Sequence, residues 1–285
     1  MLRDPLIYNE RYYREAEVFK HNYWTAGDQR RLEMICEMLP TGVTSILDIG
    51  SGRGLIVKAM RDRGFRVIAT DYSHTALSLY DGERVCCSCG QLPFRDGSFD
   101  IVACTEVLEH LDDRLYAAAV LEIARVARRY ALISVPHKEQ LVQSMMKCYE
   151  CGERYTMYGH VRTFLCHDML SLLPGFKVIC TRLGDWVIDY NPWLLWFRQH
   201  VGRTWAYWKL AMCPKCGARA RPPGIRNPIT LACDFLNNRI PWRPRRRNPL
   251  YTLYENLRQE DPGRVTELLR EQCGGTDDKS AHAPL

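Results

Sequence analysis

The chain has 285 residues, of which 46% are hydrophobic and 25% are charged, and a formal net charge of +6. A chain of this length can bury roughly three quarters of its unfolded surface, so it needs no disulfide cross-links to build a core. The opening residues lack the apolar stretch of a signal peptide, and no long uncharged apolar run follows, which argues against secretion and membrane spanning and favours a cytoplasmic protein. The thirteen cysteines are therefore expected to be free thiols or metal ligands.

Two helices are expected before the first strand. Residues 8–24 carry tyrosines, a phenylalanine and a tryptophan at roughly helical spacing among charged residues. Residues 29–40 predict a second helix, which stops at Pro40.

The stretch from Ile46 to Leu55 reads ILDIGSGRGL and predicts a strand, a glycine turn and the start of a helix. Gly50, Gly52 and Gly54 let the backbone turn tightly and approach a ligand closely. The N–H groups at the start of the helix then follow, so the loop suits a nucleotide-like cofactor. A dinucleotide fingerprint would need a third glycine at the position of Leu55, so a bound pyrophosphate is less favoured.

The next predicted strand, residues 66–70, leads to Asp71, whose carboxylate can accept hydrogen bonds from both hydroxyls of a ribose. Together with Asp48, the three glycines and the segments LPFRDGSFDIV and TEVLEHL, the sequence resembles the class I S-adenosylmethionine (SAM) dependent methyltransferases of the type 11 group. The resemblance implies an α/β fold with a Rossmann-like, seven-stranded, mostly parallel sheet and helices on both faces. It also implies a set of cofactor-binding residues: Asp48, Gly50, Ser51, Gly52, Gly54, Asp71, Tyr72, Gln91, Leu92, Thr105 and Glu106.

The resemblance also bears on two less regular parts of the chain. In this family, helices before the first strand often close over the cofactor, so residues 8–24 either do so or only pack on the sheet. The family usually places an acidic residue four positions before the leucine of LPF, where it reaches the adenine amino group. Ser88 occupies that position here, so Gln91 and Leu92 are expected to flank the ring by backbone and packing.

A candidate cation site follows the predicted strand Phe99–Cys104. Ligands of open α/β sheets bind at the carboxyl ends of strands, and on a helical turn Glu106, Glu109 and His110 would share one face. Ubiquinone-pathway O-methyltransferases and small-RNA 2′-O-methyltransferases use such an E-x-x-E-H motif with a downstream histidine, which would be His160 here, so the resemblance implies a Mg²⁺ or Mn²⁺ site. Relatives without a metal use the same motif to order the cofactor pocket, and this alternative stays open.

Residues 112–129 predict an amphipathic helix, and the segment from Tyr130 predicts a strand that ends at Pro136 and His137. His137 is either a proton acceptor or a structural hydrogen-bonding residue. The candidate catalytic residues are therefore Glu109, His110, His137 and His160.

Two C-x-x-C-G motifs, with Cys148 and Cys151 in the first and Cys213 and Cys216 in the second, have the form of zinc knuckles. Four thiolates make the tetrahedral site that zinc prefers. The gap between the motifs is longer than in a compact zinc ribbon, so the intervening chain must return to bring them together. Coincidental cysteine pairs are the alternative.

Between these motifs, residues 175–185 predict a strand, and residues 186–212 carry five tryptophans together with Arg198, Arg203 and Lys209. The second segment is too charged to span a bilayer. Three roles remain open for it: lining a pocket for a large apolar or sugar-bearing acceptor, peripheral contact with a membrane, or packing against the zinc-binding insert.

The last part of the chain predicts a helix over residues 227–240, an antiparallel last strand over residues 249–257 and a helix over residues 261–272. The arginines at 243 and 245–247 are expected to lie in a loop that is solvated or meets phosphates. The expected domains are a helical cap (1–40), a SAM-binding core (41–136), a continuation of the core with the zinc-binding and aromatic insert (137–248), the last strand and helix (249–272) and a disordered tail (273–285).

SAM carries an already activated methyl group, so the protein chiefly has to align a nucleophile and exclude water, and an alcohol also needs a base or a cation to lose its proton. The leading hypothesis is O-methylation of a hydroxylated small molecule, a glycan or a lipid-linked intermediate. One alternative is an RNA 2′-O-methyltransferase, although the sequence lacks long basic runs, which makes nucleic acid a less favoured partner. Another is a non-catalytic zinc-ribbon interaction module, against which the intact Asp48, Gly50, Gly52 and Asp71 argue.

Overall fold

The structure is a computed structural model that describes residues 13–14, 25–222 and 227–257. Most of the expected helix at 8–24, the expected helix at 261–272 and the tail at 273–285 lie outside the described residues.

A single seven-stranded sheet organises the core, with the strand order β3-β2-β1-β4-β5-β9-β8. Strands β3, β2, β1, β4 and β5 run parallel, and β9 runs antiparallel to both of its neighbours. This confirms the expected Rossmann-like, mostly parallel sheet. The strands are β1 (Ser45–Ile49), β2 (Arg66–Asp71), β3 (Arg84–Cys86), β4 (Phe99–Thr105), β5 (Ala127–Val135), β8 (Phe176–Ile188) and β9 (Arg245–Asn256).

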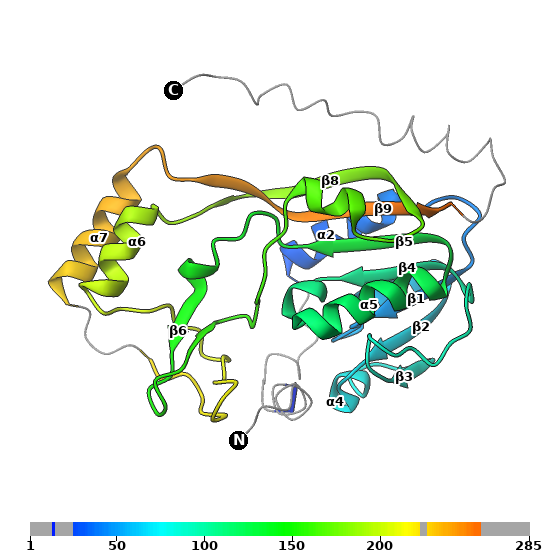
Figure 1. Ribbon diagram of the computed structural model, residues 1–285, viewed down its shortest axis with the longest axis horizontal. Coiled ribbons are helices and arrows are strands. Elements are labelled where there is room, and N and C mark those ends of the chain that lie inside the picture. The colour runs from blue at the N-terminus through cyan, green and yellow to red at the C-terminus, as the bar shows by residue number, and fades with distance from the viewer. Residues whose placement is uncertain (1–12, 15–24, 223–226, 258–285) are drawn as a thin grey trace.

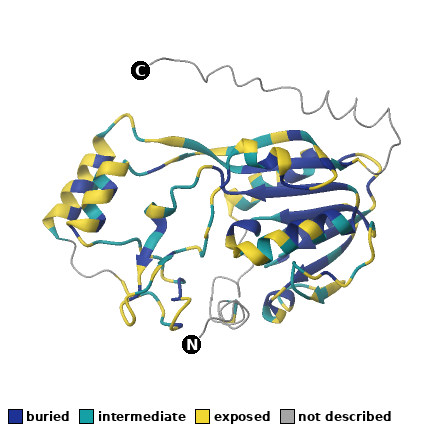
Figure 2. Cartoon of the chain, viewed as in Figure 1, coloured by how far each residue is buried: buried dark blue, intermediate teal, exposed yellow. Residues whose placement is uncertain are grey.

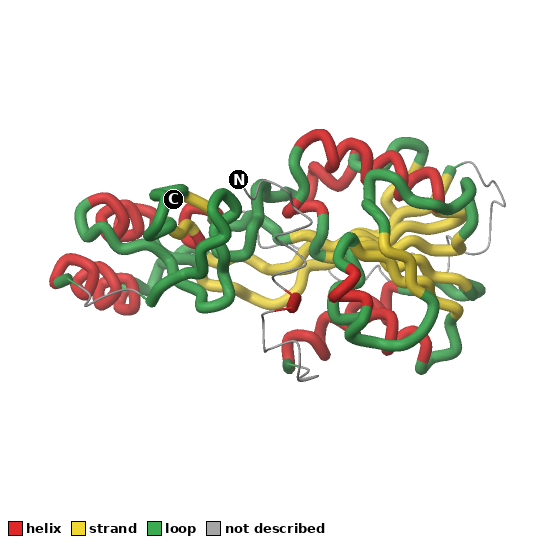
Figure 3. The backbone as a smooth tube through the Cα atoms, turned by 90° about the horizontal axis from the view of Figure 1, so that it is seen from below, coloured by secondary structure: helices red, strands yellow, loops and turns green. Residues whose placement is uncertain are grey.

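Helices cover both faces of this sheet (Figure 3). On one face, α5 packs through Ile123 and its neighbours on Leu47 and Val102; on the other, α2 and α3 pack on Ile46. Alternate residues of β1 thus enter opposite cores, as the pleat of a strand requires. The helices are α2 (Ala26–Met38), α3 (Leu55–Arg61), α4 (His74–Leu77), α5 (Asp113–Val126), α6 (Pro192–His200) and α7 (Pro228–Arg239), with 3₁₀ turns η2 (Leu108–His110), η3 (Leu141–Ser144) and η4 (Cys166–Ser171).

Two predicted boundaries are wrong. The helix expected over residues 112–129 ends at Val126, because Ala127 already pairs with Phe99 at the start of β5. The loop expected around the arginine cluster is largely strand, because β9 begins at Arg245 and pairs with β8 as far out as Ile188. In both places pairing with a neighbouring strand outweighs the local sequence preference.

The long ribbon of β8 and β9 leaves the sheet and carries α6 and α7 at its far end (Figure 1). Each of these two helices begins at an Asn-Pro pair: Asn191 and Asn227 cap the first turn with their side chains, and the proline that follows needs no N–H partner. A small hairpin of β6 (Met145–Lys147) and β7 (Arg154–Thr156) lies below the ribbon in the view of Figure 1, between the α6–α7 pair and the core. Among the described residues, every helix falls short of the length and hydrophobicity that a bilayer crossing requires.

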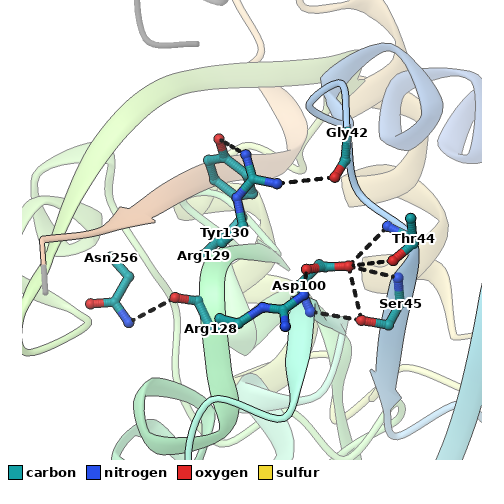
Figure 4. A network of polar contacts seen from close by, with 8 residues as sticks. All are labelled: Gly42, Thr44, Ser45, Asp100, Arg128, Arg129, Tyr130 and Asn256. Carbon is teal, nitrogen blue, oxygen red and sulfur yellow. Dashed lines mark hydrogen bonds and ion pairs between the residues drawn. The ribbon is translucent and has the colours of Figure 1, made fainter. Parts of the chain in front are cut away.

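Asp100 ties the start of β1 to β4 (Figure 4). Its Oδ2 accepts hydrogen bonds of 2.8–3.0 Å from the N–H and hydroxyl groups of Thr44 and Ser45, and its Oδ1 contacts the Arg128 guanidinium. Desolvation alone would raise the pKa of this carboxyl, but the donors outweigh it and hold the pKa of Asp100 well below its ordinary range.

Asp100→Asn is therefore expected to lower the free energy of unfolding by about 2 kcal/mol at neutral pH, because the amide replaces a charged acceptor among several donors. Since the folded-state pKa lies below the unfolded value, this stability is present above roughly pH 4 and is lost as the pH falls towards the folded-state pKa. Urea unfolding at pH 7 and in acid measures both effects. Asp96→Asn is the control, because Asp96 pairs with Arg125 but is 80% exposed and should contribute less than about 1 kcal/mol. An equal decrease of the free energy of unfolding in the two variants would contradict a special role of the buried Asp100.

Candidate functional site

The glycine loop between β1 and α3 has no room for side chains. Gly50, Gly52 and Gly54 have φ angles of +67°, +51° and +71°, in the left-handed region that favours glycine. A Cβ at Gly50 would lie 2.4 Å from Cγ2 of Val107, and one at Gly54 would lie 2.4 Å from the Tyr80 ring. The loop thus presents bare backbone at the carboxyl end of β1, as the sequence predicts.

Asp71 and Asp48 place two carboxylates beside this loop. Asp71 Oδ2 accepts a hydrogen bond from the Gly52 N–H at 2.9 Å, and its Oδ1 accepts one from the Ser73 N–H at 2.8 Å. Asp48 is 1% exposed, and its Oδ2 has no hydrogen-bond partner among the described residues. Burial and the nearby Asp71 raise the pKa of Asp48 to about 8. A cationic ligand would favour the charged form, so the pair suits a sulfonium nucleoside such as SAM.

The other expected cofactor residues lie around the loop. Ser51 Oγ lies 2.5 Å from the Tyr80 hydroxyl, which braces the glycine turn. Leu92 is buried and Gln91 is exposed, while Tyr72 is partly exposed. Thr105 lies half-buried at the end of β4, and Ser88, at the position where an acidic residue is usual, accepts a hydrogen bond from the Gly90 N–H at 3.2 Å.

A second cluster lies just past the end of β4. Ligand atoms of Glu109, His110 and His160 all lie within 4.8 Å of one another. The rings of His110 and His160 meet edge to face with centroids 4.7 Å apart, and His110 Nε2 lies 3.9 Å from Glu109 Oε1. The structure thus brings the distant His160 to the E-x-x-E-H segment, as expected from the resemblance.

Glu109 is the most unusual member of this cluster. It is fully buried, and neither of its carboxylate oxygens has a hydrogen-bond partner among the described residues. Desolvation and the nearby Glu106 raise the pKa of Glu109 well above its ordinary value. A buried carboxylate without partners is costly, and a bound cation would offset that cost. The donor set of one carboxylate and two imidazoles therefore fits a divalent metal ion.

Glu106 lies beside this cluster rather than in it. The expected helical turn does not form, because Glu106 has a φ of +55° and only Leu108–His110 form a short 3₁₀ turn. Glu106 Oε1 accepts a hydrogen bond from Ser134 Oγ at 3.0 Å, and the Glu106 N–H donates to the Ser134 carbonyl at 2.9 Å. Glu106 is thus tied to β5.

Glu139 belongs to the site, and the sequence analysis missed it. Its Oε2 lies 2.5 Å from His160 Nδ1, and both side chains are largely buried. A carboxylate on one ring nitrogen fixes the orientation and tautomer of an imidazole, which is common behind metal-binding histidines. Nothing in the spacing of Glu139 predicts this contact, because the two residues meet only through the loops that follow β5 and β7. Tyr80, which contacts the glycine loop from the segment after α4, carries no signal in the sequence either.

His137 lies outside the Glu109–His110–His160 group. Its Nδ1 lies 3.1 Å from the Arg247 carbonyl and its Nε2 lies 3.5 Å from Cys166 Sγ. The ring is 5% exposed, and burial lowers the pKa of His137. Because both ring nitrogens have partners within the fold, these contacts favour the structural alternative for this residue.

The four cysteines of the two C-x-x-C-G motifs converge on one point. Cys148 Sγ lies 3.5 Å from Cys216 Sγ, Cys151 Sγ lies 3.6 Å from Cys213 Sγ, and all four sulfurs lie within 4.8 Å of one another. The two turns match, since Gly152 and Gly217 have φ angles of +73° and +72° and donate to the carbonyls of Cys148 and Cys213. Burial would raise the pKa of Cys148, but hydrogen bonds from the backbone and from a neighbouring thiol lower it to about 7, whereas burial raises the pKa of Cys213, so without an ion the thiols of the cluster do not all ionise alike.

Comparison with known proteins connects this geometry to a family. A family model described as a methyltransferase domain matches residues 47–135, which include the glycine loop, Asp71 and the E-x-x-E-H segment. An uncharacterized protein of Methanocaldococcus jannaschii is 31% identical over 142 residues, covering 47% of this chain and 55% of that protein. A ubiquinone biosynthesis O-methyltransferase of Albidiferax ferrireducens is 30% identical over 94 residues, covering 29% of this chain and 37% of that protein.

The chain thus spans about half the length of the first of these relatives and less of the second. A crystal structure of a protein from Pyrococcus horikoshii aligns with a TM-score of 0.50 and 16% identity, covering 61% of this chain and 93% of that one. At this identity the likeness concerns the fold alone. The cysteine cluster and His160 lie beyond the segment that the family model matches.

Proposed function

We infer that this chain, whose residues 47–135 match a methyltransferase domain, is a SAM-dependent methyltransferase, and we propose that it methylates a hydroxyl group. The observation that carries the first step is the glycine loop, whose bare backbone lies against the Asp71 carboxylate at the carboxyl end of the sheet. Ligands of open α/β sheets bind at this edge.

We propose that different residues around the loop bind different parts of the cofactor. In this proposal Asp71 accepts hydrogen bonds from the ribose hydroxyls and the buried Asp48 supplies negative charge for the sulfonium, which the bare loop backbone and the burial of Asp48 support. We expect Leu92, a buried residue at the start of the LPF segment, to pack against the adenine ring. When bound, SAM supplies an activated methyl group, so the protein's remaining task is to align the acceptor and exclude water.

The Glu109, His110 and His160 cluster supports an alcohol as the acceptor. A hydroxyl group must lose its proton to attack a methyl group, and this is helped by a bound cation or by a general base. We propose that the three side chains hold Mg²⁺ or Mn²⁺, with Glu139 orienting His160. The relative named as a ubiquinone biosynthesis O-methyltransferase is consistent with this acceptor chemistry. The acceptor is proposed to be a hydroxylated small molecule, a glycan or a lipid-linked intermediate.

We further propose that Cys148, Cys151, Cys213 and Cys216 bind a structural zinc ion. The two matching knuckles and the convergence of the four sulfurs support this assignment. Four protein thiolates close the coordination sphere, which is the arrangement of structural rather than catalytic zinc.

Asp71→Asn is expected to weaken SAM binding by roughly fiftyfold, because an amide offers one acceptor oxygen where the carboxylate offers two and also loses the charge. Isothermal titration calorimetry with SAM measures the loss, and urea unfolding verifies that the variant is folded. Asp81→Asn, which changes an exposed aspartate in the loop after α4, should bind SAM as the unaltered protein does. Absence of SAM binding to the unaltered protein would refute the proposed function and favour a non-catalytic module.

A further inference from the structure

The far end of the β8–β9 ribbon forms a separate lobe. We call it the distal lobe and define it as residues 186–204 and 227–247, which comprise α6, α7 and the tips of the two strands. Figure 1 shows it well away from the glycine loop and from the end of β4. None of the candidate catalytic or cofactor-binding residues belongs to it.

Polar groups hold the two helices of this lobe together. Asp234 on α7 accepts hydrogen bonds from Arg198 Nε at 3.0 Å and from the Tyr190 hydroxyl at 2.9 Å. Thr230, Cys233 and Asn237 are the buried residues of α7. Further polar contacts inside the lobe join Thr204 Oγ1 to Thr230 Oγ1 at 2.7 Å and the Asn191 N–H to Asn237 Oδ1 at 2.8 Å, and Gln199 Nε2 donates to the carbonyl of Val142 outside the lobe at 2.7 Å.

Most large apolar residues of the same helices are exposed, although Leu195 on α6 is buried, and Figure 2 shows exposed residues along both helices. On α6, Trp193 is 78% exposed and Phe197, one turn later, is 47% exposed. On α7, Leu231 and Phe235 have the same spacing and are 52% and 58% exposed. Other exposed apolar residues of the lobe are Trp186, Ile188, Trp196, Val201, Ile229, Leu236 and Trp242.

This arrangement reverses the usual pattern of a helix pair in water. Such a pair normally turns its apolar stripe inwards and its polar face outwards. Here the polar groups satisfy one another in the interior, where their hydrogen bonds are strongest, and the apolar surface is left for the surroundings to cover. The outer surface of the lobe is therefore suited to contact with an apolar phase rather than with water.

The charged residues of the lobe indicate which apolar phase would cover this surface. Its two acidic residues, Asp189 and Asp234, are paired with Arg246 and Arg198. The exposed charged residues are cationic: Arg203, Arg239 and Arg245. Arginines beside exposed tryptophans match a surface that offers phosphate groups above hydrocarbon, which is the interface of an anionic bilayer.

The lengths of α6 and α7 limit how deeply the lobe can enter a bilayer. Helices α6 and α7 have 9 and 12 residues. At about 1.5 Å per residue neither reaches across a hydrocarbon core of about 30 Å. They can lie in the interface, with tryptophan and phenylalanine rings at the boundary between headgroups and acyl chains.

We propose that the distal lobe is a membrane-docking element that inserts its exposed aromatic and aliphatic side chains into the interface of an anionic lipid bilayer. The arginines of the lobe lie near the lipid phosphates in this arrangement. The inference rests on the surface of the lobe and stands apart from the methyl-transfer chemistry.

Flotation of the full chain with lipid vesicles tests the proposal. We expect the protein to float with phosphatidylcholine vesicles that contain about 30% phosphatidylglycerol, and to bind more weakly to phosphatidylcholine alone or at high salt, because the arginines contribute through screened charge. The double variant Leu231→Ser with Phe235→Ser should lower the partition coefficient by about tenfold or more, because binding scales with the apolar area buried. The matched control changes Leu121 on α5 and Leu170 on η4, which are 60% and 67% exposed, to serine, and it should bind as the unaltered protein does.

Two further measurements keep the outcomes distinct. Brominated lipids should quench the tryptophan fluorescence of the unaltered protein, a result that does not depend on how well a variant folds. SAM calorimetry on the same samples should be unchanged in the double variant, which separates loss of docking from loss of the proposed function. No flotation with anionic vesicles, or equal losses in the double variant and the control, would overturn the proposal. A dimer in light scattering that the double variant dissolves, with no vesicle binding, would assign the face to a second copy of the chain instead.

Discussion

Changing Cys148 and Cys213 together to serine is expected to remove one equivalent of zinc and to unfold the segment that the two knuckles hold together. One cysteine is lost from each knuckle, so neither half keeps its pair of thiolates. Structural zinc contributes on the order of 10 kcal/mol to small sites. The two knuckle segments are also joined by the ion pairs of Lys215 with Glu153 and of Arg221 with Glu150, but these are exposed and contribute little. The effect should therefore exceed that of any single hydrogen-bond loss in the chain.

The same change should also affect turnover. Cys148 directly follows β6, and the β6–β7 hairpin leads into the turn that holds His160, where the Thr156 hydroxyl donates to the His160 carbonyl at 2.7 Å. Loss of zinc is thus expected to displace His160 from Glu109 and to lower methyl transfer, while SAM binding at the distant glycine loop persists.

Metal analysis by mass spectrometry, limited proteolysis and SAM calorimetry measure these effects. The control variant changes Cys36 and Cys86, which lie outside the cluster, to serine. It should keep its zinc and its resistance to protease. Purified protein without zinc, or a Cys148→Ser, Cys213→Ser variant that folds normally, would remove the zinc proposal.

How far the sequence predicts the site depends on whether its residues are local. The glycine loop, Asp71 and the cysteine pairs each lie in a short segment whose spacing has a direct physical meaning, and the structure places them as expected. His160 was expected only because the resemblance pointed to a downstream histidine. Glu139 carries no such pattern, since its contact with His160 exists only once two separate loops have folded together.

The same distinction explains the errors in the fold. Arg245, Arg246 and Arg247 read as a solvated loop because arginine has little strand preference. They form a strand because β8 continues beyond the sheet and offers a partner edge, and because Arg246 meets the buried Asp189. For the distal lobe, the sequence revealed many tryptophans but not which of them face outwards, since that depends on the polar contacts of Asp234 and its neighbours.

Changing Glu109 to glutamine is expected to lower turnover by about a thousandfold, whether the carboxylate holds a cation or accepts the proton itself. SAM affinity should stay within a few fold, because Asp71 and the glycine loop are unaltered. Incorporation of labelled methyl groups from SAM into fractionated cell extract measures turnover. Glu83→Gln, a change in an exposed glutamate that pairs with Arg66, is the matched control and should have no effect. Turnover close to that of the unaltered protein would contradict the role of Glu109.

Two measurements, the metal dependence of turnover and the free energy of unfolding, distinguish a Glu109 that holds a cation from a Glu109 that accepts the proton. If a cation is held, Mn²⁺ should give an electron paramagnetic resonance signal of bound metal that Glu109→Gln abolishes, and a chelator should stop turnover of the unaltered protein. Without metal, the buried Glu109 favours its protonated form, so its folded-state pKa lies above the unfolded value and stability is lost as the pH rises above about 4. In chelator at pH 8, Glu109→Gln should therefore be more stable than the unaltered protein by about 1 to 2 kcal/mol, because the amide is neutral without taking up a proton when the chain folds. Lower stability of the variant in chelator would show that the carboxylate has a partner inside the fold, and the proposed cation site would then lose its physical basis.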